Sequence, residues 1–322
     1  MLTGAIDCGT NSIRLLISEI EDAETAHPRM REIIRKMRIV RLGAGVDATG
    51  WLSQQALDRT FEAAREYARD LEEHGVAAEN VRMAATSATR DAGNRAAFVR
   101  GIEQILGVSP EVISGAEEAQ LSFRGAVSAL PDPDQGRSLV VDIGGGSTEF
   151  VLGDQQGVIG ARSVDIGCVR LTERYLSSNP PSPAQVRRLI HDVDRAVASV
   201  LDQVPMGTAT RLIGVAGSIT TVTAQALGLS ADDPQAIHGA RLPVETVIEA
   251  AHALTGMTRA QRTDLGFMPE GRVDVIGAGA QIWARIIERV HELTQGRVDE
   301  VVASEQDILD GLALSVAEGA HR

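Results

Sequence analysis

Lysine is almost absent from this chain of 322 residues. Its 31 basic side chains are 30 arginines and a single lysine, Lys36, which lies between Arg35 and Met37. A P-loop requires a Gly-Lys-[Ser/Thr] run whose lysine reaches the terminal phosphates of a nucleotide. The chain therefore cannot bind nucleotides in the P-loop manner, and lysine Schiff-base and pyridoxal chemistry is disfavoured for the same reason.

Cysteine is also scarce, with only Cys8 and Cys168 in the sequence. Two cysteines make neither a disulfide framework nor a cysteine-rich zinc site, and they fit a reducing compartment. The N-terminus lacks the positively charged and then apolar pattern of a signal peptide, and no run reaches the roughly 18 apolar residues of a membrane span. We therefore expect a soluble, cytoplasmic protein with no membrane partner.

Aromatic residues make up 3% of the chain, and the formal net charge is −13. Nucleic-acid-binding proteins usually carry a basic surface with interleaved aromatic side chains, so no nucleic-acid partner is expected. An acidic chain can still bind a polyanion locally. The length suggests about two domains, and the apolar content of 43% is enough for a sizeable core.

The sequence contains two similar segments, which begin 135 residues apart at Asp7 and Asp142. Each has an apolar strand, an Asp-x-Gly-x-x-Ser turn and a returning strand, which is the pattern of a β-hairpin. We interpret them as an internal structural duplication, although Asp-x-Gly-x-x-Ser alone is a weak pattern that can arise by chance. The flanking strands are expected at residues 2–6, 13–20, 139–141 and 148–152.

The rest of the chain alternates predicted strands and helices, as an α/β protein does. The clearest break in the first half is the segment rich in Pro and Asp at residues 131–136. Further strands are expected at residues 33–42, 81–85, 111–113, 211–216 and 298–303. Helices are expected at residues 53–74, 89–106, 114–130, 183–204, from 217 onward, 243–254, 258–265, 277–294 and 306–318.

Three consecutive glycines form the second turn. A dinucleotide-binding turn would lead into a helix, whereas the residues after Ser147 alternate as in a strand. Without Cβ atoms in the way, successive N–H groups of such a turn can form a nest for an anion. A tight turn without a ligand is the alternative. We expect phosphate binding by Gly144, Gly145, Gly146 and Ser147, and by Asn11 and Ser12 of the first turn.

An aspartate opens each of the two turns. If the hairpins face each other across a cleft, Asp7 and Asp142 come together at the strand ends. Mg²⁺ takes one or two carboxylates and keeps waters and substrate phosphates as its other ligands. The two aspartates therefore fit a Mg²⁺ site, although either could instead be a turn residue that bonds only its own backbone.

Two adjacent glutamates begin the helix expected after Ser114. Ser114 and Glu117 match the Ser-x-x-Glu capping box, so Glu117 has a structural explanation. Glu118 projects about 100° further round the helix. It is free to face a cleft and take a proton from an attacking water. A solvated glutamate at a helix N-terminus fits the sequence equally well.

Two strand-to-helix junctions carry further candidates for phosphate binding. Arg90 lies where a guanidinium could bind phosphate oxygens together with helix N–H groups, although an exposed helical arginine is a common alternative. Gly217 and Ser218 begin a helix, which is the geometry of an anion site and also of an ordinary N-cap.

Six basic residues fall within the 13 positions from Arg29 to Arg41. Such a run could guide a polyanionic substrate or could be the exposed face of a hairpin, and we favour the exposed face. His191 and Asp192 resemble the dyad of a metal-dependent phosphohydrolase. They lie in an amphipathic helical pattern with no other histidine nearby, so we interpret them as a surface pair.

Four motifs follow one another along the chain: Asp7-Cys-Gly-Thr-Asn-Ser12, Ala85-Thr-Ser-Ala-Thr-Arg90, Ile113-Ser-Gly-Ala-Glu-Glu-Ala119 and Asp142-Ile-Gly-Gly-Gly-Ser-Thr-Glu149. Their order and approximate spacing resemble the exopolyphosphatase/guanosine pentaphosphate phosphohydrolase (Ppx/GppA) family. The third and fourth motifs are highly specific, and the resemblance covers essentially the whole chain. Ala216-Gly-Ser-Ile-Thr-Thr221 and the segment from Ser304 to Leu312 are also similar to that family.

The resemblance implies an α/β fold with two ribonuclease-H-like domains, of the actin-like ATPase superfamily, around a central cleft. We expect residues 1–128 plus 306–322 to form the first domain and residues 129–305 the second. Larger members carry a C-terminal HD-like domain, and this chain ends too early for one. The preferred polymer length and any activity on guanosine nucleotides are therefore left open.

The resemblance also assigns roles to residues. It implies that Glu118 is the catalytic base, that Arg90 and the glycine backbone hold phosphate, and that Asp142 and Glu149 serve water and Mg²⁺. Asp7, predicted above, completes the expected metal ligands.

These features predict a Mg²⁺-dependent exopolyphosphatase that removes terminal orthophosphate from inorganic polyphosphate, processively or stepwise, and acts as a homodimer. The alternative substrates are guanosine pentaphosphate and nucleoside di- or triphosphates. A non-enzymatic sensor of polyphosphate or of a guanosine alarmone is a second alternative. A sugar kinase or a filament-forming protein would share the fold.

Overall fold

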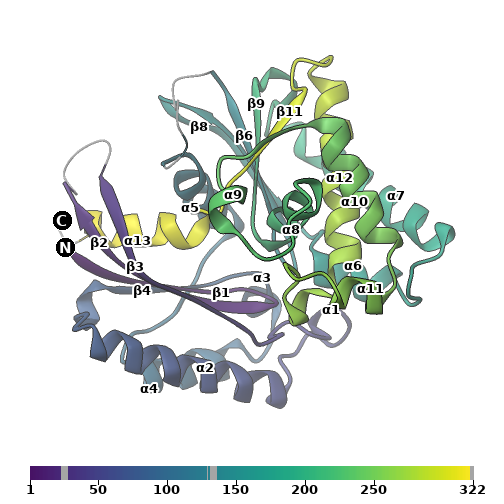
Figure 1. Cartoon of the computed structure of the whole chain (residues 1–322). Helices are drawn as coiled ribbons and strands as arrows, with labels where there is room; N and C mark the ends of the chain where they lie inside the picture. The colour runs from purple at the N-terminus through teal and green to yellow at the C-terminus, as the bar shows by residue number, and fades with distance from the viewer. Residues whose placement is uncertain (23–27, 129, 131–135, 320–322) are drawn as a thin grey trace. The chain divides into compact units, whose positions relative to one another are not determined.

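The computed structural model describes residues 1–22, 28–128, 130 and 136–319. Of the break predicted at residues 131–136, only Gly136 lies among the described residues. The chain divides into two compact units, Met1–Ser128 with Ile308–Arg322 and Ala129–Asp307. Each unit contains one mixed β-sheet (Figure 1).

The sheet of the first unit has the strand order β3-β2-β1-β4-β5. β1, β2 and β3 are antiparallel neighbours, and β4 and β5 run parallel to β1. The first predicted hairpin is confirmed, since Asp7 lies opposite Arg14 in the pairing of β1 with β2. The strands are β1 (Leu2–Cys8), β2 (Ser12–Glu21), β3 (Arg29–Ile39), β4 (Val81–Ala85) and β5 (Glu111–Val112).

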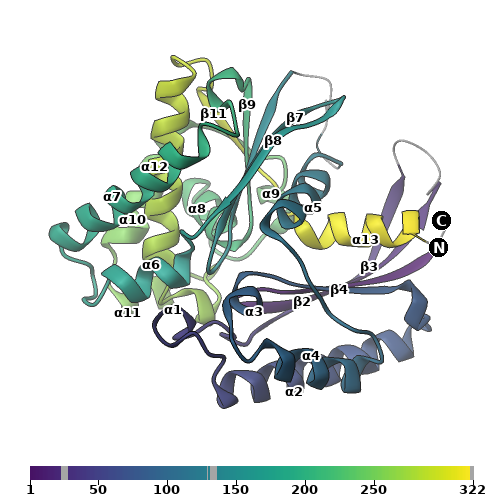
Figure 2. The same ribbon diagram turned by 180° about the vertical axis from the view of Figure 1, so that it is seen from behind.

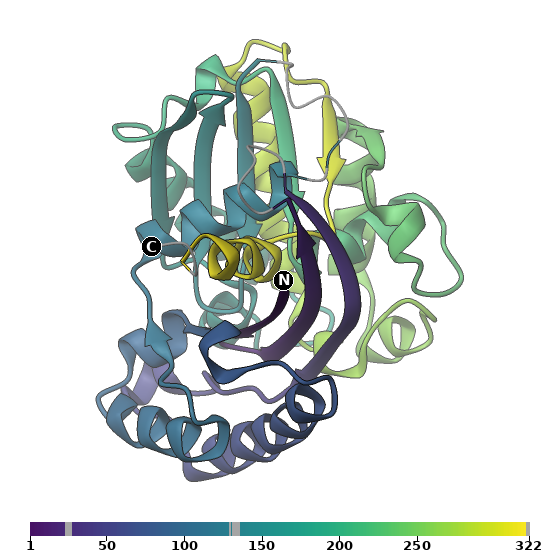
Figure 3. The same cartoon turned by 90° about the vertical axis from the view of Figure 1, so that its left-hand side faces the viewer.

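Helices cover both faces of this sheet. They are α1 (Val46–Thr49), α2 (Gln54–Glu73), α3 (Ser87–Asp91), α4 (Arg95–Leu106), α5 (Gly115–Ser128) and α13 (Ile308–Gly319). Side chains alternate between the faces along a strand, so Ile6 of β1 packs in a core with α2 and α4, whereas Ala5 packs with α13. Figures 1 and 2 show α13 and the pair α2 and α4 on opposite sides of these strands. Figure 3 shows α2 and α4 side by side.

One glycine allows α13 to pack tightly against α5. A Cβ at Gly311 would lie 2.0 Å from the carbonyl oxygen of Leu121, a distance at which the two helices would have to separate. The C-terminal helix is therefore held in the first unit by backbone contact as well as by apolar side chains such as Leu309 and Leu312.

The sheet of the second unit has the order β10-β11-β9-β6-β7-β8. The second predicted hairpin is confirmed by the antiparallel pairing of β6 with β7, in which Asp142 lies opposite Glu149. β9 runs parallel to β6, and β11 runs parallel to β9. The strands are β6 (Ser138–Ile143), β7 (Thr148–Asp154), β8 (Gly157–Val164), β9 (Arg211–Val215), β10 (Arg241–Pro243) and β11 (Glu300–Ala303).

The helices of the second unit pack on one face of its sheet. They are α6 (Cys168–Tyr175), α7 (Pro183–Val200), α8 (Gly217–Ala226), α9 (Pro234–Ile237), α10 (Val244–Gly256), α11 (Arg259–Thr263) and α12 (Ile276–Leu293). Val141 and Phe150 of the sheet join Trp283 of α12 in the core, and Figure 2 shows α7, α10 and α12 grouped together. Because side chains alternate along strands, Asp142 and Glu149 project from the other face.

The structure corrects several predicted elements. The helix expected at residues 89–106 is two helices, α3 and α4, separated at Ala92–Asn94. Gly93 N–H donates to the carbonyl of Gly50, and the Asn94 side chain bonds both the N–H and the carbonyl of Leu52. These contacts with a distant segment bend the chain where the local pattern continues a helix. β8 and α6 were not predicted, and β3 begins at residue 29 rather than 33.

Among the described residues, no helix combines the length and the apolar character needed to cross a membrane.

Candidate functional site

The glycine loop, residues 144–147, connects β6 to β7 and rests on the start of α6. Its turn is closed by a hydrogen bond of 3.0 Å from Gly144 N–H to the Ser147 carbonyl. The three glycine carbonyls all accept hydrogen bonds from α6. Cys168 N–H donates to Gly144, Val169 and Arg170 N–H donate to Gly145, and the Arg170 Nε–H donates to Gly146 at 2.7 Å.

These bonds fix the direction of the loop amides. In a trans peptide the C=O and the following N–H point in opposite directions. The N–H groups of Gly145, Gly146 and Ser147 therefore point away from α6, and none of the three donates a hydrogen bond within the part of the chain that the structure describes. Three adjacent amides without protein partners form the nest that binds phosphate oxygens. The four predicted residues are thus brought together in one loop.

Gly167, which was not predicted as a site residue, supports the glycine loop. A Cβ at this position would lie 2.2 Å from the Gly145 carbonyl oxygen, so only glycine permits the start of α6 to pack on the loop. The Thr148 hydroxyl bonds the neighbouring carbonyl of Ile166. The only signal in the sequence is a glycine 21 positions after Gly146, which predicts no such contact.

Two carboxylates lie beside the glycine loop. Asp142 and Glu149 are direct cross-strand partners, and side chains of such a pair share one face of the sheet. They are 7% and 1% exposed, and Ser163 Oγ donates to Glu149 at 2.6 Å. Like charges held together in a buried position favour a bound cation, so this pair fits Mg²⁺, which needs only one or two carboxylates from the protein.

The hairpin of the first unit has the same backbone design. Gly9 N–H donates to the Ser12 carbonyl at 3.0 Å, as Gly144 does to Ser147. The Thr10 carbonyl accepts from Gly43 N–H, and the Asn11 carbonyl accepts from two further amides of the 40–43 segment. The Asn11 N–H therefore points away from that segment, which supports the predicted phosphate-binding position.

The acidic residue of the first hairpin has a cationic partner. Arg14 lies directly opposite Asp7 across the hairpin and bonds its Oδ2 through Nε at 3.0 Å and Nη2 at 2.6 Å. This contact neutralises the aspartate and reduces its attraction for a metal ion. Sequence reasoning missed Arg14, although a residue seven positions after the aspartate is the cross-strand partner in both hairpins. The metal role of Asp7 stays a prediction.

Glu118 is 8% exposed, which excludes the solvated glutamate considered as its alternative. Arg90 Nη1 donates to Glu118 Oε2 at 3.1 Å and to the Ile113 carbonyl at 3.1 Å. The two predicted residues therefore form an ion pair within the first unit. Arg90 orients the carboxylate and keeps a positive charge next to it.

The capping box predicted for Ser114 and Glu117 forms only in part. Ser114 Oγ accepts from Glu117 N–H at 3.2 Å, so the helix is capped by Ser114. The Glu117 carboxylate does not complete the capping box. It accepts instead from Arg82 at 2.7 Å, because this arginine of β4 lies within reach.

In the second unit, an arginine side chain lies beside the start of α8. Arg272, in a short 3₁₀ turn at Glu270–Arg272, lies over Gly217 so closely that a Cβ there would be 2.1 Å from Nη2. Its Nη1 donates to Thr221 Oγ1 at 2.8 Å. Gly217 and Ser218 thus begin a helix beside a guanidinium. Arg272 was not predicted as a site residue, because nothing near it in the sequence links it to α8.

Both cysteines are buried free thiols. Burial raises the pKa of Cys168, against opposing contributions from a hydrogen bond with Ser218 and the charge of Arg272. Burial and the nearby Asp7 charge raise the pKa of Cys8 well above its usual value. Both side chains therefore stay protonated at neutral pH, and neither serves as a nucleophile.

The basic run on β3 is an exposed, paired face. Arg31 pairs with Glu19, Lys36 with Asp70 at 2.7 Å, and Arg38 with Glu66 at 2.9 Å. Arg35 pairs with Glu32 and with the fully buried Asp310 of α13. These ion pairs favour the exposed-face interpretation over a track for a polyanion.

Asp192 of α7 is occupied by neighbours. It accepts hydrogen bonds from the Tyr175 hydroxyl at 3.0 Å and from Arg195. These partners support the interpretation of His191 and Asp192 as a surface pair. Within the described ranges, no group of three or more His, Cys, Asp or Glu side chains is arranged to hold a metal ion by itself.

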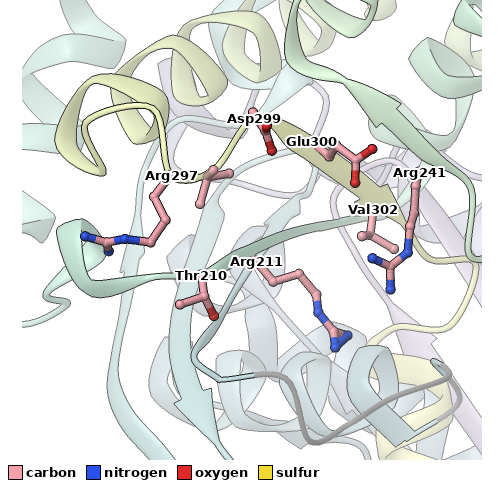
Figure 4. A pocket seen from close by; sticks show the side chains of 8 residues that line it. Thr210, Arg211, Arg241, Arg297, Asp299, Glu300 and Val302 are labelled. Atoms are coloured by element: carbon pink, nitrogen blue, oxygen red, sulfur yellow. The ribbon is translucent and has the colours of Figure 1, made fainter.

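A separate hollow of about 80 Å³ lies at the end of the second unit's strands opposite to the glycine loop. Arg211 and Glu300 of its lining begin β9 and β11, whereas the glycine loop follows the end of β6, to which β9 is parallel. No predicted site residue lines this hollow, so it is distinct from the glycine loop. Its lining side chains come from Thr210, Arg211, Arg241, Arg297, Val298, Asp299, Glu300 and Val302 (Figure 4).

The two units therefore carry different chemical groups. The first contains Asp7 paired with Arg14, the turn with Asn11 and Ser12, and the Arg90–Glu118 pair. The second contains the three outward-directed amides of the glycine loop, two adjacent carboxylates, and the start of α8 beside Arg272. Hydrolysis of a phosphate ester or anhydride needs a base that activates water and a site that binds the phosphate together with a cation.

Known proteins are similar to this chain in sequence and fold over nearly its whole length. Exopolyphosphatase 2 of Mycobacterium tuberculosis is 46% identical over 318 residues, which cover 97% of this chain and 98% of the relative. The crystal structure of an exopolyphosphatase-like protein matches with a TM-score of 0.93 at 42% identity, covering 99% of this chain and 100% of that one. An exopolyphosphatase from Cytophaga hutchinsonii matches with a TM-score of 0.87 at 25% identity, covering 99% and 98%.

These structures confirm the predicted α/β fold of the ribonuclease-H-like, actin-like ATPase superfamily. The Ppx/GppA phosphatase family matches residues 16–315, nearly the whole chain. On this evidence the chain belongs to the Ppx/GppA phosphatase family.

Proposed function

We propose that this protein is an exopolyphosphatase, a phosphoanhydride hydrolase that removes terminal orthophosphate from inorganic polyphosphate with the help of Mg²⁺. The observation that carries the proposal is the glycine loop, with three amide groups directed away from α6 and two buried carboxylates beside it. The identity of 46% with Exopolyphosphatase 2 supports polyphosphate as the substrate.

The second unit supplies the groups that bind the terminal phosphate. N–H groups of residues 145–147 donate to its oxygens, and the fixed orientation of these amides means that little reorganisation is needed as charge develops. Asp142 and Glu149 would hold Mg²⁺, with Asp7 as a further candidate ligand. When bound, this ion neutralises charge on the phosphate oxygens.

The first unit supplies the base. Glu118 accepts the proton of the attacking water at a carboxylate oxygen. Arg90 holds that carboxylate in place, and its guanidinium can also bind a phosphate oxygen. The leaving group is the shortened polyphosphate, whose departing phosphate oxygen is a weak base, so no strong acid is required.

The test is orthophosphate release from polyphosphate in the presence of Mg²⁺. We expect Glu118→Gln to lower turnover on the order of 1,000-fold, because general-base catalysis contributes roughly 10²- to 10⁴-fold. Glu117→Gln is the matched control, since Glu117 pairs with Arg82 and is expected to retain activity. Unchanged turnover in Glu118→Gln would remove the assigned base.

A substrate panel separates the alternatives. Faster release from guanosine pentaphosphate or from nucleoside triphosphates than from polyphosphate would make those compounds the substrates. Tight binding of polyphosphate without release would identify a sensor. The homodimer and the cytoplasmic location stay predictions from the sequence, and the dimer can be checked by sedimentation.

A further inference from the structure

The start of α6 supports the glycine loop through both backbone and side chain. Backbone N–H groups of α6 hold the carbonyls of Gly144 and Gly145. The carbonyl of Gly146 is held differently, by the side chain of Arg170, whose Nε–H donates to it at 2.7 Å. No other hydrogen bond to the Gly146 carbonyl occurs in the part of the chain that the structure describes.

This carbonyl controls one of the three nest amides. The Gly146 carbonyl and the Ser147 N–H belong to a single planar peptide, so fixing the first fixes the direction of the second. A peptide next to glycine has wide rotational freedom. Without the arginine, the Ser147 amide would sample orientations in which it does not face the phosphate.

The ion pair with Asp165 does not explain the position of Arg170. Asp165 is 3.9 Å away and has a side chain that is 73% exposed, whereas the Arg170 side chain is 12% exposed. An ion pair of that length with an exposed partner contributes little. The short bond to the loop carbonyl is the stronger contact, because hydrogen bonds from charged donors are the stronger class.

We propose that Arg170 is a positioning residue that orients the Gly146–Ser147 peptide and thereby sets the affinity of the glycine loop for the terminal phosphate of the substrate. The inference rests on the proposed function, because it assigns the loop to substrate phosphate. Arg170 acts through the Ser147 amide and takes no part in proton transfer.

The kinetic test compares Arg170→Gln, Arg170→Lys and Arg174→Gln. Arg174 lies one turn further along α6, 3.7 Å from Asp192, so its replacement removes the same charge without touching the loop. We expect Arg170→Gln to raise KM for polyphosphate about 10- to 100-fold, the range given by loss of a hydrogen bond from a charged group. Turnover at saturation should fall by a smaller factor than KM rises, because two of the three nest amides keep their direction.

The lysine variant separates positioning from folding. Its ammonium can donate to the same carbonyl, so we expect Arg170→Lys to recover most of the affinity, and Arg174→Gln to match the wild type. Equal KM values for Arg170→Gln and Arg174→Gln would overturn the proposal. A fall in melting temperature that accounts for the lost activity, with no recovery in Arg170→Lys, would also overturn it.

A second measurement does not depend on turnover. Inorganic orthophosphate is added to ¹⁵N-labelled protein, and the amide signals of residues 145–147 are followed. We expect the wild-type loop to respond as a group, and the Ser147 signal in Arg170→Gln to lose its response while Gly145 keeps it. If the wild type binds phosphate in this way but does not hydrolyse polyphosphate, the proposed function fails and the role of Arg170 stands. An unchanged Ser147 response in Arg170→Gln would contradict that role.

Discussion

The two hairpins of this protein share a backbone design and differ in charge. Both close their turn with a bond of 3.0 Å between a glycine N–H and a serine carbonyl, and both place an aspartate opposite the residue seven positions later. In the first hairpin that residue is Arg14, which neutralises Asp7. In the second it is Glu149, which adds a carboxylate to Asp142.

The difference shows how duplicated scaffolds can divide a task. In an Asp–Arg pair the two charges neutralise each other, so no bound ion is needed. Two buried carboxylates on one face of a sheet favour a cation between or beside them. The second hairpin also has three consecutive glycines and a loop supported by α6. Under the proposed function, the comparison predicts that cation and phosphate binding depend chiefly on the second hairpin and less on the first.

The largest expected effect comes from removing the aspartate of each hairpin in turn. We expect Asp142→Asn to lower Mg²⁺-dependent turnover on the order of 1,000-fold, because it removes negative charge from the proposed cation site. Asp7→Asn should lower turnover only about tenfold, because Arg14 already neutralises this aspartate. Turnover measured over a range of Mg²⁺ concentrations tests both variants. Equal losses of turnover would contradict the proposed difference between the two hairpins.

The supporting glycines provide the next comparison. Gly167→Ala places a Cβ 2.2 Å from the Gly145 carbonyl, so the phosphate nest must shift. Gly43→Ala meets the Thr10 methyl group at 2.3 Å, which disturbs a side chain beside the first turn. We expect KM for polyphosphate to rise about 10- to 100-fold in Gly167→Ala, as for lost positioning, and less in Gly43→Ala. A larger rise in Gly43→Ala would reverse the assignment.

The loss of stability on removing one charge should differ between the two hairpins. Arg14→Gln leaves Asp7 buried without its charge partner, which costs 3–5 kcal/mol for a fully buried pair and about 2 kcal/mol here, because Arg14 is partly exposed. Glu149→Gln removes one of two adjacent buried negative charges and keeps an acceptor for Ser163, so without Mg²⁺ it should cost less stability than Arg14→Gln. Urea unfolding in the presence of a chelator measures the free energy of unfolding of both variants. A larger loss in Glu149→Gln than in Arg14→Gln would contradict this expectation.

The smallest effect concerns the two thiols. Both pKa values are raised, that of Cys8 well above the ordinary value, so the reactive thiolate form is depleted at pH 8 and increases only as pH rises further. We expect iodoacetamide to modify both cysteines slowly at pH 8, with Cys8 slower than Cys168. Mass spectrometry after timed alkylation checks the order, with the urea-unfolded protein as the fully reactive control.

Much of the fold could be predicted from local patterns. The hairpins, the parallel strands and most long helices follow from apolar periodicity and from turn residues, which act over a few positions. The break between α3 and α4 could not be predicted in this way, because it is set by Gly50 and Leu52, some forty residues earlier. β8 and α6 were missed because their weak patterns gain stability only by packing on β7 and the glycine loop.

Some residues of the candidate site could likewise be predicted from local sequence patterns, whereas others could not. Glycines, aspartates and the Glu117–Glu118 pair are visible as motifs, and the capping argument distinguishes Glu118 from Glu117 without a structure. Arg170 and Arg272 lie in no motif, because their importance comes from carbonyls and glycines they meet only after folding. The pairing of Arg14 with Asp7 could have been inferred by comparing the two repeats position by position.

By itself, the sequence determined that phosphate must be bound without a P-loop lysine, since the chain has only Lys36. It also determined the two hairpins and the residue types at their turns, because those depend on neighbours along the chain. Only the tertiary structure decided that Lys36 and three arginines of β3, Arg31, Arg35 and Arg38, are paired surface residues, and that Arg170 holds the glycine loop. The reason is that a charge acquires its role from the groups within a few ångströms of it, and those groups are brought close by folding.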